Sequence, residues 1–347
     1  HMKVKAYAVH SPKSLLEPYE FERRKPNADD VTIQIHFCGI CHSDIHTARG
    51  EWGTPKYPCV PGHEIVGHVI AVGKKVKKFK VGDQVGVGCM VDSCGRCANC
   101  KAGEEQFCTK GAIFTYNSNE YDGKSYTKGG YSSHIVVKDK FVLKLKKGLP
   151  LDRVAPLLCA GITTYSPLKR FNTKKGSKVG VVGLGGLGHM AIKLAKAMGA
   201  EVTVFSTSPT KEKDAKKLGA KNFVVTKDPK NFAPFTGKLD LIIDTVSVAH
   251  DYTPYLGTLK VGGTHVLIGV PEKPTDFGAG PLIFGRKQLA GSLIGGIKET
   301  QEMLDFCAKK KIFSDIELIQ AAQINEAYDR TVKGDVKYRF VVDAKSL

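Results

Sequence analysis

The chain has 347 residues, of which 42% are hydrophobic and 25% charged, a length that favours two domains and a composition typical of globular proteins. No apolar run approaches the roughly 20 residues that a membrane span needs, and no secretion signal is visible, so we expect a cytoplasmic protein without membrane contact. The net charge of +18 comes from scattered lysines that are not interleaved with aromatic residues, which argues against nucleic-acid binding and for a solvated basic surface.

The first part of the chain, residues 3–150, is rich in short β-branched runs separated by Gly, Pro, Asn and Asp. Strands of this kind without helical periods between them predict a small barrel-like or irregular β domain. The expected strands are residues 31–37, 64–72, 84–87, 132–137 and 141–145.

A four-cysteine segment stands out within this region. Ten cysteines in a chain without a secretion signal favour metal binding or catalysis over a disulfide framework. Four of them, Cys94, Cys97, Cys100 and Cys108, have a spacing that can close a tetrahedron around Zn²⁺ with no open position, which predicts a structural zinc site. An iron–sulfur cluster is the alternative, because its cysteine spacing can look similar.

From about residue 176 strands alternate with helices, which predicts a doubly wound parallel sheet of the α/β class. The expected strands are residues 178–182, 201–205, 222–225, 239–243 and 264–268, and the expected helices are residues 189–198, 210–218 and 253–259. A further helix at residues 301–310 and a closing strand at 338–342 are expected to return to the first domain.

A glycine-rich turn follows the first of these parallel strands and opens a helix. In this βαβ context the glycines let the backbone approach a pyrophosphate at a helix N-terminus, which predicts dinucleotide binding. The cofactor-binding residues expected here are Gly183, Gly185, Gly186, Leu187 and Gly188.

The end of the second strand indicates which dinucleotide binds. NAD-binding versions of the fold place an acid about 20 residues after the first glycine. This chain instead has Ser206, Thr207 and Ser208, followed by Lys211. Hydroxyls and a lysine suit a 2′-phosphate, so NADP(H) is predicted, with a polar loop indifferent to the phosphate as the alternative.

Three further residues can form an open metal site. Cys41, His63 and Cys159 offer the S, N and S ligands of a catalytic zinc, with a fourth place for water or substrate. Each residue alone is equally typical of a small core cysteine or a hydrogen-bonded histidine. Their occurrence beside a nucleotide-binding fold is what favours the zinc site.

Taken together, these motifs resemble the zinc-dependent medium-chain alcohol dehydrogenases, closest to the cinnamyl alcohol dehydrogenase group. The resemblance covers nearly the whole chain, including residues 39–44, 62–67, 82–88 and 335–343. It implies a GroES-like β-rich catalytic domain at 1–157 and 297–347, and a Rossmann cofactor domain at 158–296. A homodimer through an edge strand of the cofactor domain is expected from the same resemblance.

The resemblance also implies roles for individual residues. Cys41, His63 and Cys159 would bind the catalytic zinc, with Glu64 as an alternate ligand, and the four clustered cysteines a second zinc. The proton path would use Ser43 and His46.

Other roles are implied less directly. Asp44 would orient the zinc ligands, or else cap a helix. His42 and Arg339 would face the cofactor phosphates. Trp52 and Cys89 would line the substrate pocket, although ordinary packing explains Trp52 equally well.

The sequence thus predicts an NADP(H)-dependent enzyme with two Zn²⁺ per chain that interconverts aldehydes and alcohols of cinnamyl, benzyl or broad primary type. A polyol or other secondary-alcohol dehydrogenase is the alternative, although an acid after the second strand and no four-cysteine segment would be more usual there. A zinc-ribbon nucleic-acid binder would leave the nucleotide fold unexplained.

Overall fold

The chain folds into two compact units in the computed structural model, which describes residues 2–347. The first unit contains the residues up to Ile162 and those from Gly295 onward, and the second runs from Thr163 to Ile294. The boundaries expected from the sequence, after residues 157 and 296, lie a few residues from these. None of the helices in the described residues is long and apolar enough to cross a membrane.

A seven-stranded sheet organises the first unit, in the order β16-β17-β3-β4-β5-β9, with β8 also paired to β3. Two separate hairpins, β1–β2 and β6–β7, complete its strands. The strands are β1 (Met2–Ala8), β2 (Glu17–Arg23), β3 (Asp30–Gly39), β4 (Glu64–Val72), β5 (Gln84–Val87), β6 (Met90–Asp92), β7 (Ile113–Phe114), β8 (His134–Lys138), β9 (Leu143–Lys144), β16 (Ile316–Ile319) and β17 (Arg339–Asp343). The helices are α1 (His42–Ala48), α2 (Ala98–Lys101), α3 (Leu151–Val154), α9 (Ile297–Lys310) and α10 (Ile324–Val332), and α4 (Ala160–Arg170) begins here and continues into the second unit.

Strand β3 is the centre of this sheet, because β17, β4 and β8 all pair with it. Its apolar residues, such as Val31 and Ile33, are buried. Antiparallel pairing of β17 with β3 places Val341 opposite Gly39. The C-terminal strand therefore lies beside the segment that leads into Cys41.

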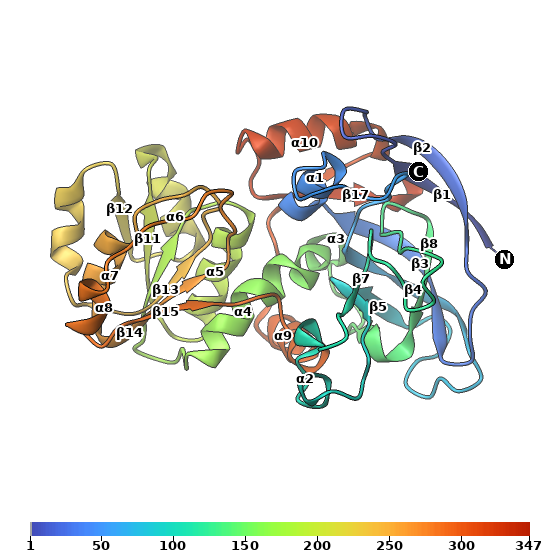
Figure 1. Ribbon diagram of the computed structural model, residues 1–347, viewed down its shortest axis with the longest axis horizontal. Helices are drawn as coiled ribbons and strands as arrows, with labels where there is room; N and C mark the ends of the chain where they lie inside the picture. The colour runs from blue at the N-terminus through green and yellow to red at the C-terminus, as the bar shows by residue number, and fades with distance from the viewer. Residues whose placement is uncertain (1) are drawn as a thin grey trace. The chain divides into compact units, whose positions relative to one another are not determined.

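The second unit contains a six-stranded, entirely parallel sheet in the order β12-β11-β10-β13-β14-β15 (Figure 1). Numbered within the unit this is 3-2-1-4-5-6, so the predicted Rossmann fold is confirmed. The strands are β10 (Lys178–Val182), β11 (Glu201–Ser206), β12 (Asn222–Val225), β13 (Leu239–Asp244), β14 (Leu259–Leu267) and β15 (Gln288–Gly291). The helices are α5 (Gly186–Ala197), α6 (Glu212–Leu218), α7 (Thr253–Thr258) and α8 (Gly280–Ile283).

Several local elements differ from what was expected, and two of them are instructive. Residues 141–145 were expected to form a strand, but a 3₁₀ turn ends at Phe141 and β9 keeps only two residues. Helix α4 was not predicted, because Pro167 inside it is a helix-breaking signal. Burial of the residues around it favours the helix all the same.

Candidate active site

Three donor side chains meet inside the first unit, although they come from distant parts of the sequence. Cys41 is the N-cap residue of α1 directly after β3, His63 precedes β4, and Cys159 precedes α4. Because β3 and β4 are antiparallel with Gly39 opposite Glu64, the end of one strand lies beside the start of the other. The three donor atoms lie within 4.8 Å of one another, and Cys41 Sγ is 3.8 Å from Cys159 Sγ. We call Cys41, His63 and Cys159 the donor cluster.

The chemistry of the donor cluster fits a divalent metal ion. All three side chains are buried, and within residues 2–347 His63 Nε2 has no hydrogen-bond partner. A hydrogen bond with Cys159 lowers the pKa of Cys41 well below its ordinary value, and the charge of Arg339 acts in the same direction against the effect of burial. A buried, bare imidazole nitrogen is costly unless something binds it. Zinc accepts this set of donors and keeps a fourth position open.

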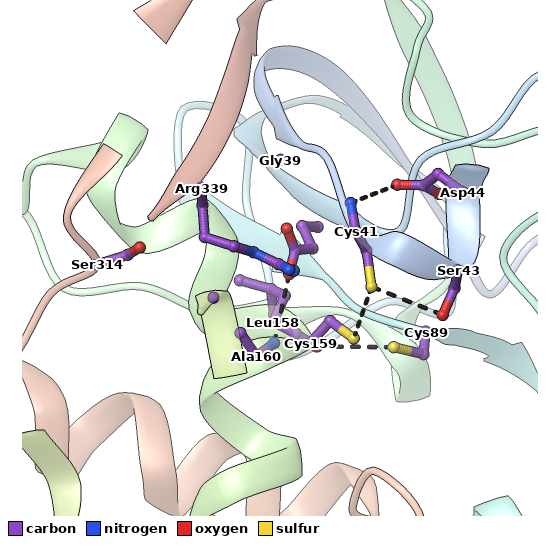
Figure 2. A network of polar contacts seen from close by, with 12 residues as sticks. Gly39, Cys41, Ser43, Asp44, Cys89, Leu158, Cys159, Ala160, Ser314 and Arg339 are labelled. Carbon is purple, nitrogen blue, oxygen red and sulfur yellow. Dashed lines mark hydrogen bonds and ion pairs between the residues drawn. The ribbon is translucent and has the colours of Figure 1, made fainter. Parts of the chain in front are cut away.

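A buried ion pair lies beside the donor cluster (Figure 2). Arg339 Nη2 donates to Glu64 Oε2, which also accepts from the backbone N of Ala160 at 3.3 Å. Burial raises the pKa of Glu64 to about 8, against the opposing charge of Arg339. Among the described residues Glu64 Oε1 has no partner, and a Cβ at Gly39 would collide with it. This pair was not predicted; ligation by Glu64 and phosphate contact by Arg339 stay predictions.

Asp44 joins the two segments that carry Cys41 and His63. Its Oδ2 accepts from the backbone N of Cys41 at 2.8 Å, and its Oδ1 accepts from the backbone N of Gly62 at 3.1 Å. Burial raises the pKa of Asp44, although the charge of His63 opposes this. The bond to Cys41 is part of the N-terminal cap of α1. The bond to Gly62 holds the segment that carries His63. The capping role is therefore observed, and the orientation of zinc ligands by Asp44 stays a prediction.

Other polar residues of α1 make contacts of their own. Ser43 Oγ accepts a hydrogen bond, at 3.6 Å, from the thiol that precedes the helix. His46 Nδ1 lies 2.8 Å from Glu51 Oε2, and its ring stacks on Trp52 with the centroids 4.8 Å apart. The His42 ring lies 6.3 Å from that of His46. Glu51 was missed because an exposed acid in a loop carries no sequence signal, and Trp52, 56% exposed, covers His46.

Cys89 contacts the donor cluster directly, and Figure 2 shows its thiol facing that of Cys159. It also lies against His63 and 3.9 Å from the carbonyl oxygen of Leu158. The hydrogen bond to Cys159, followed by the charge of His63, lowers the pKa of Cys89 to about 6 despite its burial. A third thiol therefore borders the donors, and its place in a substrate pocket stays a prediction.

The four-cysteine segment forms a second group of donor atoms within 4.8 Å of one another. Backbone N–H groups point at its sulfurs: those of Arg96 and Cys97 donate to Cys94 Sγ, and that of Cys100 donates to Cys97 Sγ, at 3.3–3.4 Å. Three of the cysteines are half-buried and Cys108 is buried. Four sulfurs at this spacing can hold one zinc in a closed site.

In the second unit, the structure brings the two predicted cofactor segments together. Strands β10 and β11 are parallel neighbours, so their carboxyl ends meet. Gly183 follows β10 with a φ of +92°, and α5 begins at Gly186. Lys211 Nζ donates to the carbonyl oxygen of Leu184 at 3.4 Å, which links the loop after β11 to the glycine turn.

Hydroxyl residues of the loop after β11 also make hydrogen bonds. Ser206 is buried at the end of β11, and its Oγ accepts from the backbone N of Ser208 at 3.1 Å. Thr207 lies between them, and Leu187 and Gly188 lie in the first turn of α5. A Cβ at Gly188 would collide with the carbonyl oxygen of Gly183, so the turn needs glycine there. This cradle fits a dinucleotide.

Comparison with known proteins adds family matches over both units. Residues 27–147 match the alcohol dehydrogenase GroES-like domain, and residues 186–309 match the zinc-binding dehydrogenase family. The chain is 55% identical, over 99% of both sequences, to NADP-dependent alcohol dehydrogenase C 1 of Mycolicibacterium smegmatis.

Two solved structures are similar over almost their whole length. The cinnamyl alcohol dehydrogenase SbCAD4 of Sorghum bicolor has a TM-score of 0.96 and 45% identity, covering 99% of this chain and 98% of that one. A cinnamyl alcohol dehydrogenase of Helicobacter pylori, complexed with NADP(H), has a TM-score of 0.93 and 47% identity, covering 99% of both chains.

Proposed function

This chain belongs to the zinc-dependent alcohol dehydrogenase family, and from that premise we propose that it is an NADP(H)-dependent enzyme that interconverts aldehydes and alcohols. The observation that carries the proposal is the meeting of Cys41, His63 and Cys159, with a bare ring nitrogen, in a chain that also has a glycine-turn cradle. Family matches fall in both units, and the chain aligns with 99% of the Mycolicibacterium smegmatis relative.

The donor cluster would hold the catalytic zinc. When bound there, zinc acts as a Lewis acid that stabilises negative charge on the substrate oxygen. Asp44 keeps two donor segments in register through its bonds to the backbone N–H groups of Cys41 and Gly62. Arg339 pairs with Glu64, so that a buried acidic group can stand beside the donors.

A proton path starts at the same place. The Ser43 hydroxyl contacts Cys41 Sγ, so it lies at the edge of the donor cluster and can give a proton to a substrate oxygen. His46 is the next histidine along α1 after Ser43, and Glu51 holds its Nδ1. We assign the outer end of the path to His46, positioned by Glu51.

The cofactor is NADP(H). Lys211 supplies a positive charge at the carboxyl end of β11, beside the hydroxyls of Ser206, Thr207 and Ser208, where NAD-binding folds have an acid. The lysine lies close enough to the glycine turn to bond Leu184 O, so one ammonium can serve a phosphate bound at either segment. We assign the 2′-phosphate to this loop.

For the substrate we propose cinnamyl- or benzyl-type aldehydes, with Cys89 bordering the reacting group and Trp52 at the edge of the pocket. The structural zinc belongs to the four-cysteine segment. Ten free cysteines favour a reducing compartment, and we place the protein in the cytoplasm.

We also propose a homodimer that forms through β15, the last strand in the parallel sheet. Close to it Ile283 is 71% and Phe284 93% exposed, an unusual state for large apolar side chains. Light scattering should give twice the chain mass for the natural sequence and a single chain mass for Phe284→Asp. A monomeric natural chain would refute this part of the proposal.

The test of the cofactor and reaction is the reduction of benzaldehyde and cinnamaldehyde with NADPH and, separately, with NADH. The natural chain should prefer NADPH, and Ser206→Asp should reverse this preference by roughly tenfold or more in kcat/KM, because a carboxylate repels the 2′-phosphate. Ser14→Asp, which adds the same charge on an exposed turn of the first unit, is the control and should keep the NADPH preference. A natural preference for NADH would refute the assignment of the loop.

A further inference from the structure

A group of ionisable side chains at the carboxyl end of β13, two of them buried and one half-buried, has no part in the reaction described above. Asp244 is 1% exposed, and its Oδ2 accepts hydrogen bonds from two imidazole rings. His250 Nε2 lies 2.5 Å from this oxygen, and His265 Nε2 lies 2.9 Å from it. Its other oxygen, Oδ1, accepts from the backbone N of Val246 at 3.1 Å. The carboxylate therefore ties together the strand, the loop that follows it and β14.

The two histidines differ in what surrounds their second nitrogen. His250 Nδ1 lies 2.7 Å from the carbonyl oxygen of Val248, whereas His265 Nδ1 is buried without a partner in the part of the chain that the structure describes. A carbonyl oxygen and a carboxylate only accept hydrogen bonds. His250 can make both of its bonds only when both nitrogens carry a proton, that is, as the imidazolium. His265 makes a single side-chain hydrogen bond, through Nε2, to Asp244.

The loop that His250 closes, residues 245–250, packs against the glycine turn. Thr245 donates from its backbone N and from Oγ1 to the carbonyl oxygen of Val182, at 3.1 and 2.7 Å. A Cβ at Gly183 would lie 2.7 Å from Thr245 Oγ1 and 3.1 Å from Val246 Cγ2. The loop thus forms the wall against which the first glycine of the cradle rests.

The groups that face His250 favour its charged form. Asp244 from β13 and Asp251, which follows His250 in the chain, carry negative charge. The rings of Tyr252 and Tyr255 meet the imidazole edge to face, with centroids 5.1 and 5.9 Å away. The His265 ring from β14 shares the Asp244 oxygen. Burial alone would lower the pKa of His250, but the bonds to Asp244 and the Val248 carbonyl raise it above its ordinary value.

We propose that protonated His250 is a positioning residue that holds the 245–250 loop against the glycine turn, and that its deprotonation weakens NADP(H) binding. The proposal rests on the assignment of the glycine turn to NADP(H). Because the bound proton is needed for the second hydrogen bond, the stabilisation is fully present below the ordinary pKa of histidine. It is lost as the pH rises through the raised pKa of His250.

The test is to titrate the full chain with NADPH and to monitor binding through the nucleotide fluorescence, at pH values from about 6.5 to about 9.5. The dissociation constant of the natural protein should rise roughly three- to tenfold over this range. His250→Gln has one donor group where the imidazolium has two, so it should bind weakly and with little pH dependence. His250→Lys keeps a charged donor through most of the range, and should move the loss of affinity to higher pH.

The matched control is His68→Gln, which changes a half-buried histidine of the first unit that is bonded to His36 and lies outside both sites. It should keep the natural pH profile. A natural profile in His250→Gln, or a natural protein whose NADPH affinity does not change with pH, would overturn the role of His250 and leave the proposed function standing. Failure of the natural protein to bind NADPH at every pH would overturn the proposed function as well.

Discussion

The two groups of sulfur donors in the first unit are built in opposite ways. The four cysteines of the segment 94–108 lie within one short stretch, and backbone N–H groups of that same stretch point at their sulfurs. The donor cluster joins Cys41 and Cys159, 118 positions apart in sequence, through the sheet that carries them. Four sulfur donors can close around a metal ion, whereas three donors leave a fourth position for another ligand.

The largest effect that separates the two groups is expected from Cys159→Ala. Removing one of three donors should release the catalytic zinc and lower kcat/KM at least roughly a thousandfold, since several kcal/mol of transition-state stabilisation depend on the metal. Aldehyde reduction and zinc content, measured on the same sample, check this. The folded chain should keep one zinc.

Cys307→Ala is the control, because Cys307 is equally buried but belongs to neither group. It should keep both zinc ions and most of the activity. Near-natural turnover in Cys159→Ala would remove this residue from the donor cluster.

The next largest effect is expected at the buried ion pair beside the donor cluster, for which the four-cysteine segment has no counterpart among the described residues. Arg339→Met leaves Glu64 buried without its partner and should lower the free energy of unfolding by about 3–5 kcal/mol. Adding Glu64→Gln should restore part of this loss. Denaturant unfolding provides the measurement.

Arg330→Met is the matched control, since Arg330 pairs with Glu317 and Asp335 at the surface. Its cost should stay within about 1 kcal/mol. Equal costs for the two arginine variants would show that the buried pair does not support the site.

A smaller effect is expected from Cys97→Ser in the four-cysteine segment. The variant should lose the other zinc and about 2–3 kcal/mol of stability, which lowers the melting temperature by roughly 5–10 °C. Below that temperature it should still reduce aldehyde. Ser93→Ala is the control, because Ser93 contacts Cys100 but is not one of the four metal ligands, and this variant should keep both zinc ions. A Cys97→Ser enzyme that melts like the natural protein would mean that the segment is not a structural zinc site.

The same difference explains what could be predicted from the sequence. The four-cysteine spacing and the glycine turn are local patterns, so their chemistry follows from neighbouring residues. The convergence of Cys41, His63 and Cys159 was expected from their occurrence beside a nucleotide-binding fold and from the family resemblance, because no spacing rule joins them. Other features depend on strand pairing and loop geometry, which the sequence does not display. They are the pairing of Glu64 with Arg339, 275 positions apart, the bond between Asp44 and Gly62, and the position of His250 between two hydrogen-bond acceptors.

The most direct test of the two-site account is the zinc content of the purified natural chain before and after brief dialysis against a chelator. The account predicts two zinc ions per chain, of which the one at the open donor cluster leaves first, with loss of activity and retention of the fold. One zinc ion per chain at the outset, or the simultaneous loss of both, would contradict it.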